Sequence, residues 1–565
     1  MPTITVNIKD LQHLMGMAMD RRELEDRLRV AKAELDEYDE TAGEARIELN
    51  DTNRPDLWCT EGLARQLRAH QTGKCCDYPF FNENPSDEDH LSGNLFIDVD
   101  VRLEKIRPFV AAFEVKGPPV TDAFLVQIIQ TQEKLCENYG RKRRSVAIGI
   151  YNAAKIAFPV RYVAAGPEEY SFVPLGFDGP MTLKQILEEH PKGKEYGKWV
   201  QDSEWYPLLT DREGKVLSFP PIINSRETGE VVVGDSHLFV EATGLDMRQL
   251  VLVMNIMAAN FADRGWEVTP VSIKLPYESE FGQEIQTPMN LNTRIDLALE
   301  DFSRTVGEEC DPGEVVKTLG NYGVAASVEN GRITASCPAY RDDYLHAMDV
   351  VEDFAISRGF HSFEPVMPSA FTVGKLKPLT VLVDRMRDQM VGLGFEELFS
   401  NLLTNRTVER DNMLLAEDPI VSVDNVMTDT YSVLRSSIIP SLLRVESKSS
   451  KALYPHKLFE AGEVCRWDPD APSGSRTETR LAALWASADS GFSQIHAVLD
   501  VLLFYMVREY TLRPAEYPFY FEGRSGDVIR GGEVIGHIGE IHPEVLTRFN
   551  INMPCAAFEL VLNCI

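Results

Sequence analysis

The sequence has little that would mark a secreted or membrane-bound protein. Its 565 residues contain nine cysteines, of which only Cys75-Cys76 stand close together, and no Cys-x-x-Cys pair occurs. Scattered thiols are typical of a reducing compartment and argue against a disulfide framework or a thiolate zinc site. No apolar run is long enough to span a bilayer, and the first residues, 1–6, show no signal-peptide pattern. We therefore expect a cytoplasmic protein with no membrane partner.

Positive charge is also scarce. The chain has 57 lysines and arginines against 87 acidic residues, which gives a net charge of −30. Such a chain repels nucleic acid as a whole, so any RNA contact must come from a local basic patch or from a partner. The densest basic cluster follows a predicted helix and consists of Arg141, Lys142, Arg143 and Arg144. The sequence leaves open whether this cluster is a solvated loop that offsets the helix dipole or a phosphate-binding patch.

The chain is too long for a single hydrophobic core. Its content of 44% hydrophobic and 25% charged residues is that of an ordinary globular protein. Helical and strand patterns alternate irregularly along it, which predicts an α+β, multidomain fold. We predict a polar linker at residues 82–94 and four domains at residues 1–85, 95–272, 276–364 and 375–565.

Several local patterns make specific predictions. Asp10 is the expected N-cap of the first helix, and the Asn53-Arg54-Pro55-Asp56 segment is expected to turn a strand into a helix. Residues 292–308 are predicted to be helical. Asn330-Gly331 is a favourable hairpin turn between two strand-like segments. The last domain is predicted to pack helices on a mainly antiparallel sheet.

An unusual acidic stretch lies in the third predicted domain. Asp349, Glu352 and Asp353 stand at i, i+3 and i+4 and so share one face of a predicted helix, while Asp343 precedes it. Four carboxylates without a thiolate would suit a hard ion such as Mg²⁺ better than zinc. The alternative is an amphipathic helix whose acidic face is solvated, and the pattern alone favours that alternative.

The predicted strand at residues 237–244 carries two polar side chains on an otherwise apolar segment. Glu241 and Thr243 are two residues apart, so they point to the same side. A carboxylate beside a hydroxyl would orient a polar group of a small ligand. The alternative is an edge strand with its polar face in water, and without further motifs this alternative is favoured.

A set of short motifs runs through the chain in one order. These are Asn53-Arg54-Pro55-Asp56-Leu57, Gln132-Glu133-Lys134-Leu135, Val146-Ala147-Ile148-Gly149, Pro220-Pro221-Ile222-Ile223-Asn224, Arg341-x-Asp343 with Asp349-x-x-Glu352-Asp353, Leu458-Phe459-Glu460 and Gly539-Glu540-Ile541-His542-Pro543. Together they make the chain resemble the β subunits of phenylalanyl-tRNA synthetases, of the shorter archaeal and eukaryotic type.

The resemblance implies an α₂β₂ phenylalanine–tRNA ligase that charges tRNA(Phe) with phenylalanine at the expense of ATP. The aminoacylation site would lie in the catalytic α subunit, so this chain would hold no catalytic residue for that reaction. Residues 95–272 would form a tRNA-editing domain that clears tyrosyl-tRNA(Phe). Residues 375–565 would form an inactive, degenerate class II synthetase-like antiparallel-sheet domain.

The resemblance also implies roles for individual residues. The editing pocket would contain Glu241 and Thr243, with Ser218 and Leu209 as further members. The basic cluster at 141–144 would guide the acceptor end of the tRNA. Mg²⁺ would brace a subunit interface and would be bound by four carboxylates, those of Asp343, Asp349, Glu352 and Asp353.

The chemistry of the last domain can be compared with what a class II core needs. Glu460 follows Phe459 where an arginine would hold the ATP α-phosphate, and no arginine follows residues 536–541 before Pro543. Carboxylates do not hold a polyanion, so we predict that this domain does not activate an amino acid. Two other hypotheses remain: a non-catalytic scaffold that has lost editing, and a stand-alone Mg²⁺-dependent phosphate-handling enzyme. Against the second, no phosphate-cradling glycine loop lies near the acidic stretch.

Overall fold

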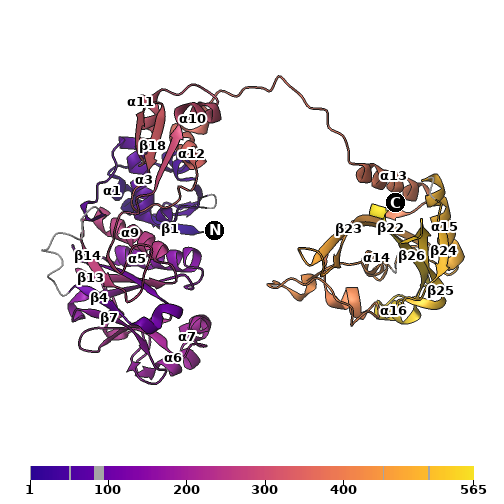
Figure 1. Ribbon diagram of the computed structural model, residues 1–565, viewed down its shortest axis with the longest axis horizontal. Helices are drawn as coiled ribbons and strands as arrows, with labels where there is room; N and C mark the ends of the chain where they lie inside the picture. The colour runs from indigo at the N-terminus through magenta and orange to yellow at the C-terminus, as the bar shows by residue number, and fades with distance from the viewer. Residues whose placement is uncertain (1, 50–51, 82–94, 450, 507–508, 565) are drawn as a thin grey trace. The chain divides into compact units, whose positions relative to one another are not determined.

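The computed structural model describes residues 2–49, 52–81, 95–449, 451–506 and 509–564. The chain forms two compact units, Met1–Val366 and Met367–Ile565, each with its own sheets (Figure 1). Mixed helices and sheets in both units confirm the α+β, multidomain prediction. The linker predicted at residues 82–94 lies outside the described residues.

The first part of unit 1 is a small antiparallel sheet with three helices. The sheet has the order β1-β3-β2, and the elements are β1 (Thr3–Asn7), β2 (Glu34–Asp39), β3 (Glu44–Glu48), α1 (Ile8–Met15), α2 (Arg21–Leu28) and α3 (Thr60–Thr72). The prediction that Asp10 caps α1 is wrong. Asn7 is the N-cap, and its side chain accepts a hydrogen bond from the Asp10 backbone N–H at 3.1 Å. An asparagine such as Asn7, the last residue of β1, is as good an N-cap as an aspartate.

A ten-stranded sheet makes the centre of unit 1. Its order is β12-β11-β10-β7-β4-β14-β5-β13-β6, with β15 on β14. The strands are β4 (Phe96–Val99), β5 (Phe109–Lys116), β6 (Val146–Asn152), β7 (Val160–Ala165), β10 (Tyr206–Thr210), β11 (Val216–Phe219), β12 (Ile223–Asn224), β13 (His237–Gly244), β14 (Glu267–Lys274) and β15 (Glu284–Thr287). The largely buried helix α9 (Met247–Asp263) packs on β5 and β13, and α5 (Asp122–Lys134) leads through a π-helical turn toward β6.

A short insertion lies between β7 and β10. It contains the two-stranded pair β8 (Ser171–Phe172) and β9 (Met181–Thr182) and the helices α6 (Leu183–Glu189) and α7 (Pro191–Tyr196). The four-residue helix α8 (Arg226–Gly229) follows β12.

The third part of unit 1 has the sheet order β16-β18-β17. Its elements are β16 (Arg294–Ala298), β17 (Ala325–Glu329), β18 (Arg332–Ser336), α10 (Leu299–Val306), α11 (Pro312–Asn321) and α12 (Ala347–Arg358). The helix predicted at residues 292–308 is wrong in its first half, because β16 pairs with β18 before α10 begins. The hairpin is confirmed, and Asn330 and Gly331 both adopt positive φ, at 50° and 74°, as its tight turn requires.

Unit 2 is built on a seven-stranded sheet of order β19-β22-β23-β27-β26-β25-β24, antiparallel except where β19 meets β22. The strands are β19 (Glu396–Glu397), β22 (His456–Trp467), β23 (Ser475–Ala486), β24 (Thr511–Pro514), β25 (Tyr520–Arg530), β26 (Glu533–Ile541) and β27 (Cys555–Val561). A separate pair, β20 (Leu403–Thr404) and β21 (Val433–Leu434), stands outside this sheet. The mainly antiparallel sheet is as predicted, although β24 and β25 were not foreseen.

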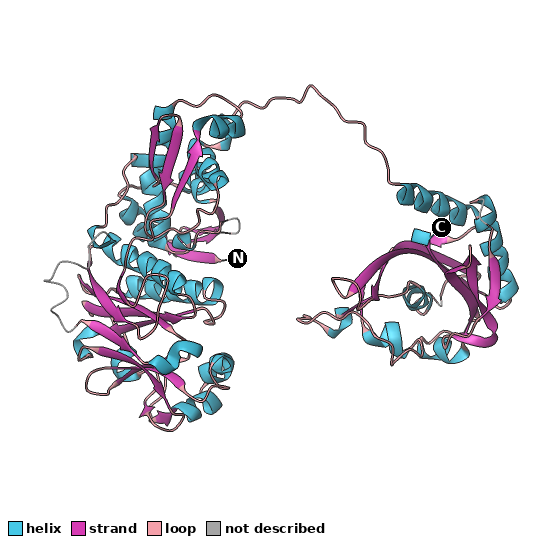
Figure 2. Ribbon diagram, in the orientation of Figure 1, coloured by secondary structure: helices cyan, strands magenta, loops and turns pink. Residues whose placement is uncertain are grey.

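Helices cover both faces of this sheet (Figure 2), and the strand side chains alternate between two hydrophobic cores. Phe459 and Leu481 face the core shared with α13 (Pro378–Gly392) and α15 (Phe492–Tyr505). Leu458 and Ala482 face the other core, with α14 (Ile439–Glu446) and α16 (Pro543–Arg548). The apolar stretches of these strands are therefore buried on both sides.

All nine cysteines are free thiols, which agrees with the expectation from their spacing. A search of the helices in the described ranges found none that has both the length and the apolar character needed to cross a membrane.

Candidate functional site

The centre of the candidate site is the carboxyl group of Glu241 on β13. The Tyr151 hydroxyl lies 2.7 Å from Glu241 Oε1 and 2.8 Å from Ser218 Oγ. Since a hydroxyl has one proton, Tyr151 donates to the carboxyl group and accepts from the serine. Tyr151 belongs to β6 and Ser218 to β11, so strands near opposite ends of the sheet order meet at this point.

Glu241 has one oxygen that is not used. The residue is only 2% exposed, and its Oε2 is buried with no hydrogen-bond partner among the described residues. Burial raises the pKa of Glu241 to about 7, although the hydrogen bond from Tyr151 and the charge of Arg107 act in the opposite direction. A buried acceptor without a donor is costly, and it is satisfied when a ligand brings a donor.

Thr243 lies on the same side of β13 and is held by Arg107. Arg107 Nε donates to Thr243 Oγ1 at 2.9 Å, and its Nη1 donates to the Arg144 carbonyl oxygen at 2.9 Å. Leu209 on β10 is fully buried and is the register partner of both Ser218 and Tyr162. Two residues that the sequence did not single out thus hold the predicted polar residues: Tyr151 joins Glu241 to Ser218, and Arg107 holds Thr243.

Gly149 is a further residue that sequence reasoning missed. It is the register partner of Glu241 on β6, and a Cβ atom there would lie 2.1 Å from Tyr151 Oη and 2.3 Å from Glu241 Oε1. Any side chain would therefore displace the hydrogen-bonded pair. A glycine inside an apolar strand is itself a signal of close approach, and Tyr151 stands two residues later, on the same side.

The basic cluster is a tight turn rather than an extended loop. Arg141, Lys142 and Arg143 all adopt left-handed φ values of 50°, 55° and 62°. Arg143 is half-buried: its Nη1 donates to the Ile222 carbonyl oxygen at 3.0 Å, and its guanidinium lies 4.5 Å from the ring centre of Tyr196. Arg143 therefore holds the turn in place.

The other three members of the cluster are exposed. The Arg144 guanidinium lies 5.5 Å from the Trp199 ring, and Trp199 Nε1 donates to the Lys142 carbonyl oxygen at 3.1 Å. Lys198 lies over the same ring at 4.8 Å. Exposed cations thus surround a half-buried indole, a combination that suits a polyanion with stacking bases.

The acidic stretch is organised by Arg341, whose side chain is fully buried. Its guanidinium donates to Asp343 at 2.7 and 2.9 Å and to Asp353 at 2.8 Å, and Asp353 also accepts from the Tyr344 hydroxyl at 2.8 Å. Burial would raise the pKa of Asp343, but the charge of Arg341 outweighs it and lowers that pKa to about 2. Burial raises the pKa of Asp353.

The other two carboxylates have different partners. Asp349 accepts hydrogen bonds from the backbone N–H groups of Leu345 and His346, both at 2.7 Å, at the start of α12. Glu352 accepts from Lys32 Nζ at 2.5 Å. No group of three or more histidine, cysteine, aspartate or glutamate side chains in the described part of the chain is arranged to hold a metal ion. Arg341 serves both Asp343 and Asp353, while Asp349 and Glu352 have separate partners, so a single Mg²⁺ site on the four carboxylates stays a prediction.

In unit 2, Glu460 follows Phe459 on β22. Its carboxylate accepts from Arg435 Nη1 at 2.7 Å and from the Ser400 hydroxyl at 2.5 Å. Arg435 and Glu460 are 3% and 1% exposed. The guanidinium is therefore already neutralised and is not free for a phosphate.

Comparison with known proteins places the chain in a family. A model of the "phenylalanyl tRNA synthetase beta chain CLM domain" matches residues 364–562, and one of the "tRNA synthetase B5 domain" matches residues 295–360. A phenylalanine–tRNA ligase β subunit from Borrelia garinii subsp. bavariensis is 39% identical over 100% of this chain and 99% of its own length. The chain belongs to the phenylalanyl-tRNA synthetase β-subunit family.

Two further proteins similar to this chain are also phenylalanyl-tRNA synthetase β subunits. The β subunit from Treponema pallidum subsp. pallidum is 35% identical over 99% of both chains. An N-terminal fragment of the Pyrococcus horikoshii phenylalanyl-tRNA synthetase β subunit superposes with a TM-score of 0.58 at 36% identity, covering 63% of this chain and 99% of the fragment. Borrelia and Treponema are bacteria, so the expectation of an archaeal or eukaryotic type is not supported by these relatives.

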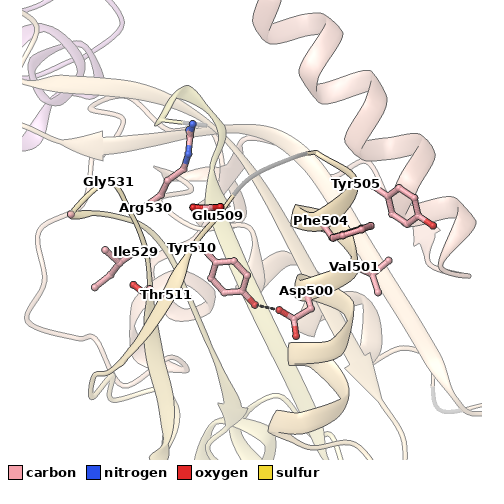
Figure 3. A pocket seen from close by; sticks show the side chains of 11 residues that line it. Asp500, Val501, Phe504, Tyr505, Glu509, Tyr510, Thr511, Ile529, Arg530 and Gly531 are labelled. Atoms are coloured by element: carbon pink, nitrogen blue, oxygen red, sulfur yellow. Dashed lines mark hydrogen bonds between the residues drawn. The ribbon is translucent and has the colours of Figure 1, made fainter.

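This family member has a further cavity on unit 2, away from the residues predicted from sequence. It has a volume of about 960 Å³ and lies between the end of α15 and strands β24 and β25 (Figure 3). Tyr510 donates a hydrogen bond to Asp500 at 2.5 Å, while the residues Phe504 and Tyr505 are 76% and 61% exposed. Neighbouring exposed aromatic rings are a feature of surfaces that another chain covers.

Proposed function

We propose that this chain is the editing and assembly subunit of a cytoplasmic, α₂β₂ phenylalanine–tRNA ligase. The α subunit carries the aminoacylation site, where phenylalanine, ATP and tRNA(Phe) react. The present chain hydrolyses tyrosyl-tRNA(Phe) that the α subunit makes by mistake. The four carboxylates of the acidic stretch remain the proposed Mg²⁺ ligands, and ATP is used by the α subunit.

The observation that carries the editing proposal is the unpartnered Oε2 of Glu241. Phenylalanine and tyrosine differ by one hydroxyl, and an apolar pocket rejects an added hydroxyl poorly. In the editing site the tyrosine hydroxyl donates to Glu241 Oε2 and satisfies it. Phenylalanine has no such donor, so it would leave the buried oxygen unpaired, and this difference favours tyrosine.

The hydrolytic step is assigned to an oriented water molecule. The hydroxyls of Tyr151 and Ser218 are committed to the hydrogen-bonded chain with Glu241, and Thr243 accepts from Arg107. The residues of the described pocket thus form no nucleophile–base pair of the serine- or cysteine-hydrolase kind. Hydrolysis would then be accelerated by positioning the ester beside a water molecule, with help from the terminal ribose.

The basic cluster is assigned to the tRNA. Arg107 contacts both Thr243 in the pocket and the Arg144 carbonyl oxygen in the cluster, so the two sites share one support. Arg141, Lys142 and Arg144 are exposed and are assigned to the phosphates near the acceptor end. This local patch reconciles an RNA substrate with a net charge of −30.

The same proposal assigns the predicted domains. Residues 95–272 form the editing domain, residues 375–565 form a class II-like domain that has lost catalysis, and residues 1–85 and 276–364 support them. The buried Arg435–Glu460 pair supports the loss of catalysis. The exposed rings of Phe504 and Tyr505 support a partner contact on unit 2.

The test is hydrolysis of tyrosyl-tRNA(Phe) by the purified complex. Glu241→Ala is expected to slow this hydrolysis by about tenfold or more, the loss of one charge-assisted hydrogen bond in a dry site. Charging of tRNA(Phe) with phenylalanine should not change. Glu267→Ala, at an exposed position of β14, is the matched control and should leave both rates unchanged.

Two results would contradict the proposal. If wild-type complex does not hydrolyse tyrosyl-tRNA(Phe), the chain is an assembly scaffold without editing. If it does, but Glu241→Ala and Thr243→Ala are both as fast as wild type, the pocket lies elsewhere. A stand-alone phosphate-handling enzyme would instead show ATP–pyrophosphate exchange without an α subunit.

A further inference from the structure

A second cavity in unit 2 has the features of a binding site. It has a volume of about 650 Å³ and lies against the middle of the seven-stranded sheet. Its lining includes Glu409 and Arg410 from a π-helical turn, Arg466 at the end of β22, and the aromatic residues Tyr517 and Phe519. These residues play no part in the editing pocket, which belongs to unit 1.

Arg410 is a buried cation without a carboxylate hydrogen-bond partner. It is 5% exposed, and its guanidinium donates to the Pro419 carbonyl oxygen and the Ser436 hydroxyl, both at 2.8 Å, and more weakly to the carbonyl oxygens of Glu409 and Asp418. Carbonyl oxygens fix the orientation of the guanidinium but do not cancel its charge. Burial therefore lowers the pKa of Arg410.

Arg466 lies close enough to Arg410 for its charge to lower the pKa of Arg410 further. The Arg466 side chain is exposed and forms no hydrogen bond or ion pair within the described ranges. The cavity's other two arginines differ, since Arg480 pairs with Glu478 at 2.6 Å and Arg476 pairs with the same residue at 3.1 Å. An anion bound between Arg410 and Arg466 would therefore reduce the repulsion between their like charges.

The acidic groups near this pair leave room for an anion. Glu409 and the exposed Asp418 are the acids that stabilise charged Arg410. Glu409 is 1% exposed, and burial raises its pKa to about 7. Glu559, also in the lining, is committed to the Ser437 hydroxyl and the Ile438 backbone N–H, at 2.6 and 2.9 Å.

Glu409 also offers a specific contact. Its Oε2 accepts from the Ser436 backbone N–H at 3.1 Å, while its Oε1 is buried and has no partner in the described structure. An unpaired buried oxygen beside an unneutralised guanidinium is an arrangement that a ligand with both an acid group and a donor would complete.

We propose that this cavity binds a small organic anion, whose acid group contacts Arg410 and Arg466 and whose hydroxyl or amino group donates to Glu409. The aromatic wall of Tyr517 and Phe519 then covers its carbon skeleton. The class II-like domain is thereby assigned a ligand-binding role that does not depend on editing.

The experiment uses crystals of the whole complex soaked in selenate, a small anion with an anomalous signal. A peak is expected between Arg410 and Arg466, and its height over a series of concentrations gives an apparent Kd for that site alone. Arg466→Ser, an exposed substitution, should raise this Kd by about tenfold or more. Lys448→Ser removes an exposed cation elsewhere in unit 2 and should leave it unchanged.

The second arm tests the donor contact. Glycolate and acetate carry the same acid group, but only glycolate has a hydroxyl for Glu409, so glycolate should displace selenate at lower concentration. Absence of a peak between the two arginines overturns the proposal. A peak that Arg466→Ser does not weaken would be an adventitious ion only, and also overturns it. Equal displacement by acetate and glycolate overturns the role of Glu409.

Discussion

At the scale of single residues, burial of the Glu241 carboxyl group makes the stability of the fold depend on pH. Its pKa is raised from 4.5 to about 7, because burial disfavours the carboxylate more than Tyr151 and Arg107 favour it. The folded state therefore holds its proton more tightly than the unfolded state. The free energy of unfolding contributed by this group is full below about pH 4.5 and falls as the pH rises to about 7.

Glu241→Gln should remove this pH dependence. A difference of this size corresponds to about 3 kcal/mol of stability at most. Calorimetry of the chain between pH 5 and pH 8 measures the unfolding temperature of unit 1. As the pH rises, this temperature should fall less in the variant than in wild type. Glu409 also titrates near pH 7 but belongs to unit 2, so it should affect the other transition. An equal decline of the unit 1 transition in both proteins would contradict the raised pKa of Glu241.

Gly149→Ala tests the same pocket from the opposite strand. The added Cβ would meet Tyr151 Oη at 2.1 Å and Glu241 Oε1 at 2.3 Å, so the two side chains must separate. We expect hydrolysis of tyrosyl-tRNA(Phe) to fall by about tenfold or more, with phenylalanine charging retained. Gly179→Ala is the control, since no atom lies within 4 Å of its added Cβ. If Gly149→Ala edits as fast as the control, the Tyr151–Glu241 contact is not needed.

The sequence predicts side-chain direction along a strand but not the partners across it. Alternation correctly placed Glu241 and Thr243 on one side of β13. It could not supply Tyr151, because the contact spans 90 residues along the chain. The acidic stretch shows the same limit more severely. Its four carboxylates lie close together in the sequence, but the cation that pairs with Glu352 is Lys32, 320 residues away.

At the scale of elements, α12 is fastened to the chain before it by a buried ion network. Arg341→Met would leave Asp343 and Asp353 without their cation in a dry site, which costs about 3–5 kcal/mol. Amide exchange should then lose protection across residues 294–358. Arg294→Met is the control, because it breaks an exposed pair with Asp296 and should cost at most about 1 kcal/mol. Equal protection in the two variants would mean that Arg341 does not hold this region.

Element prediction succeeded where the local signal was self-contained. The Asn330-Gly331 turn fixes its hairpin by itself, since both residues must accept positive φ. It failed where pairing decides the outcome: residues 294–298 have an amphipathic pattern compatible with a helix, but their hydrogen bonds go to β18. Strands β24 and β25 were also missed: β24 is short and mostly exposed, and β25 buries residues without a regular alternation.

At the scale of the whole molecule, residues 364–377 join the two units with every residue exposed and without helix or strand. Phe371 and Met367 are 90% and 86% exposed. Brief chymotrypsin treatment of the isolated chain should therefore cut first in this segment. Mass spectrometry should find two fragments that end near the boundary at Val366 and Met367. First cuts inside either unit would contradict the division.

The Tyr151–Glu241 contact has a consequence for how selectivity is built. In the proposed reaction the carboxyl group is shared by two phenols: Tyr151 holds Oε1 permanently, and the tyrosine of the mischarged tRNA takes Oε2 for the length of one turnover. The protein thus carries an internal copy of the group that it selects. Tyr151 keeps the carboxyl group oriented between substrates, so the binding free energy of the substrate phenol is not spent on orienting that group.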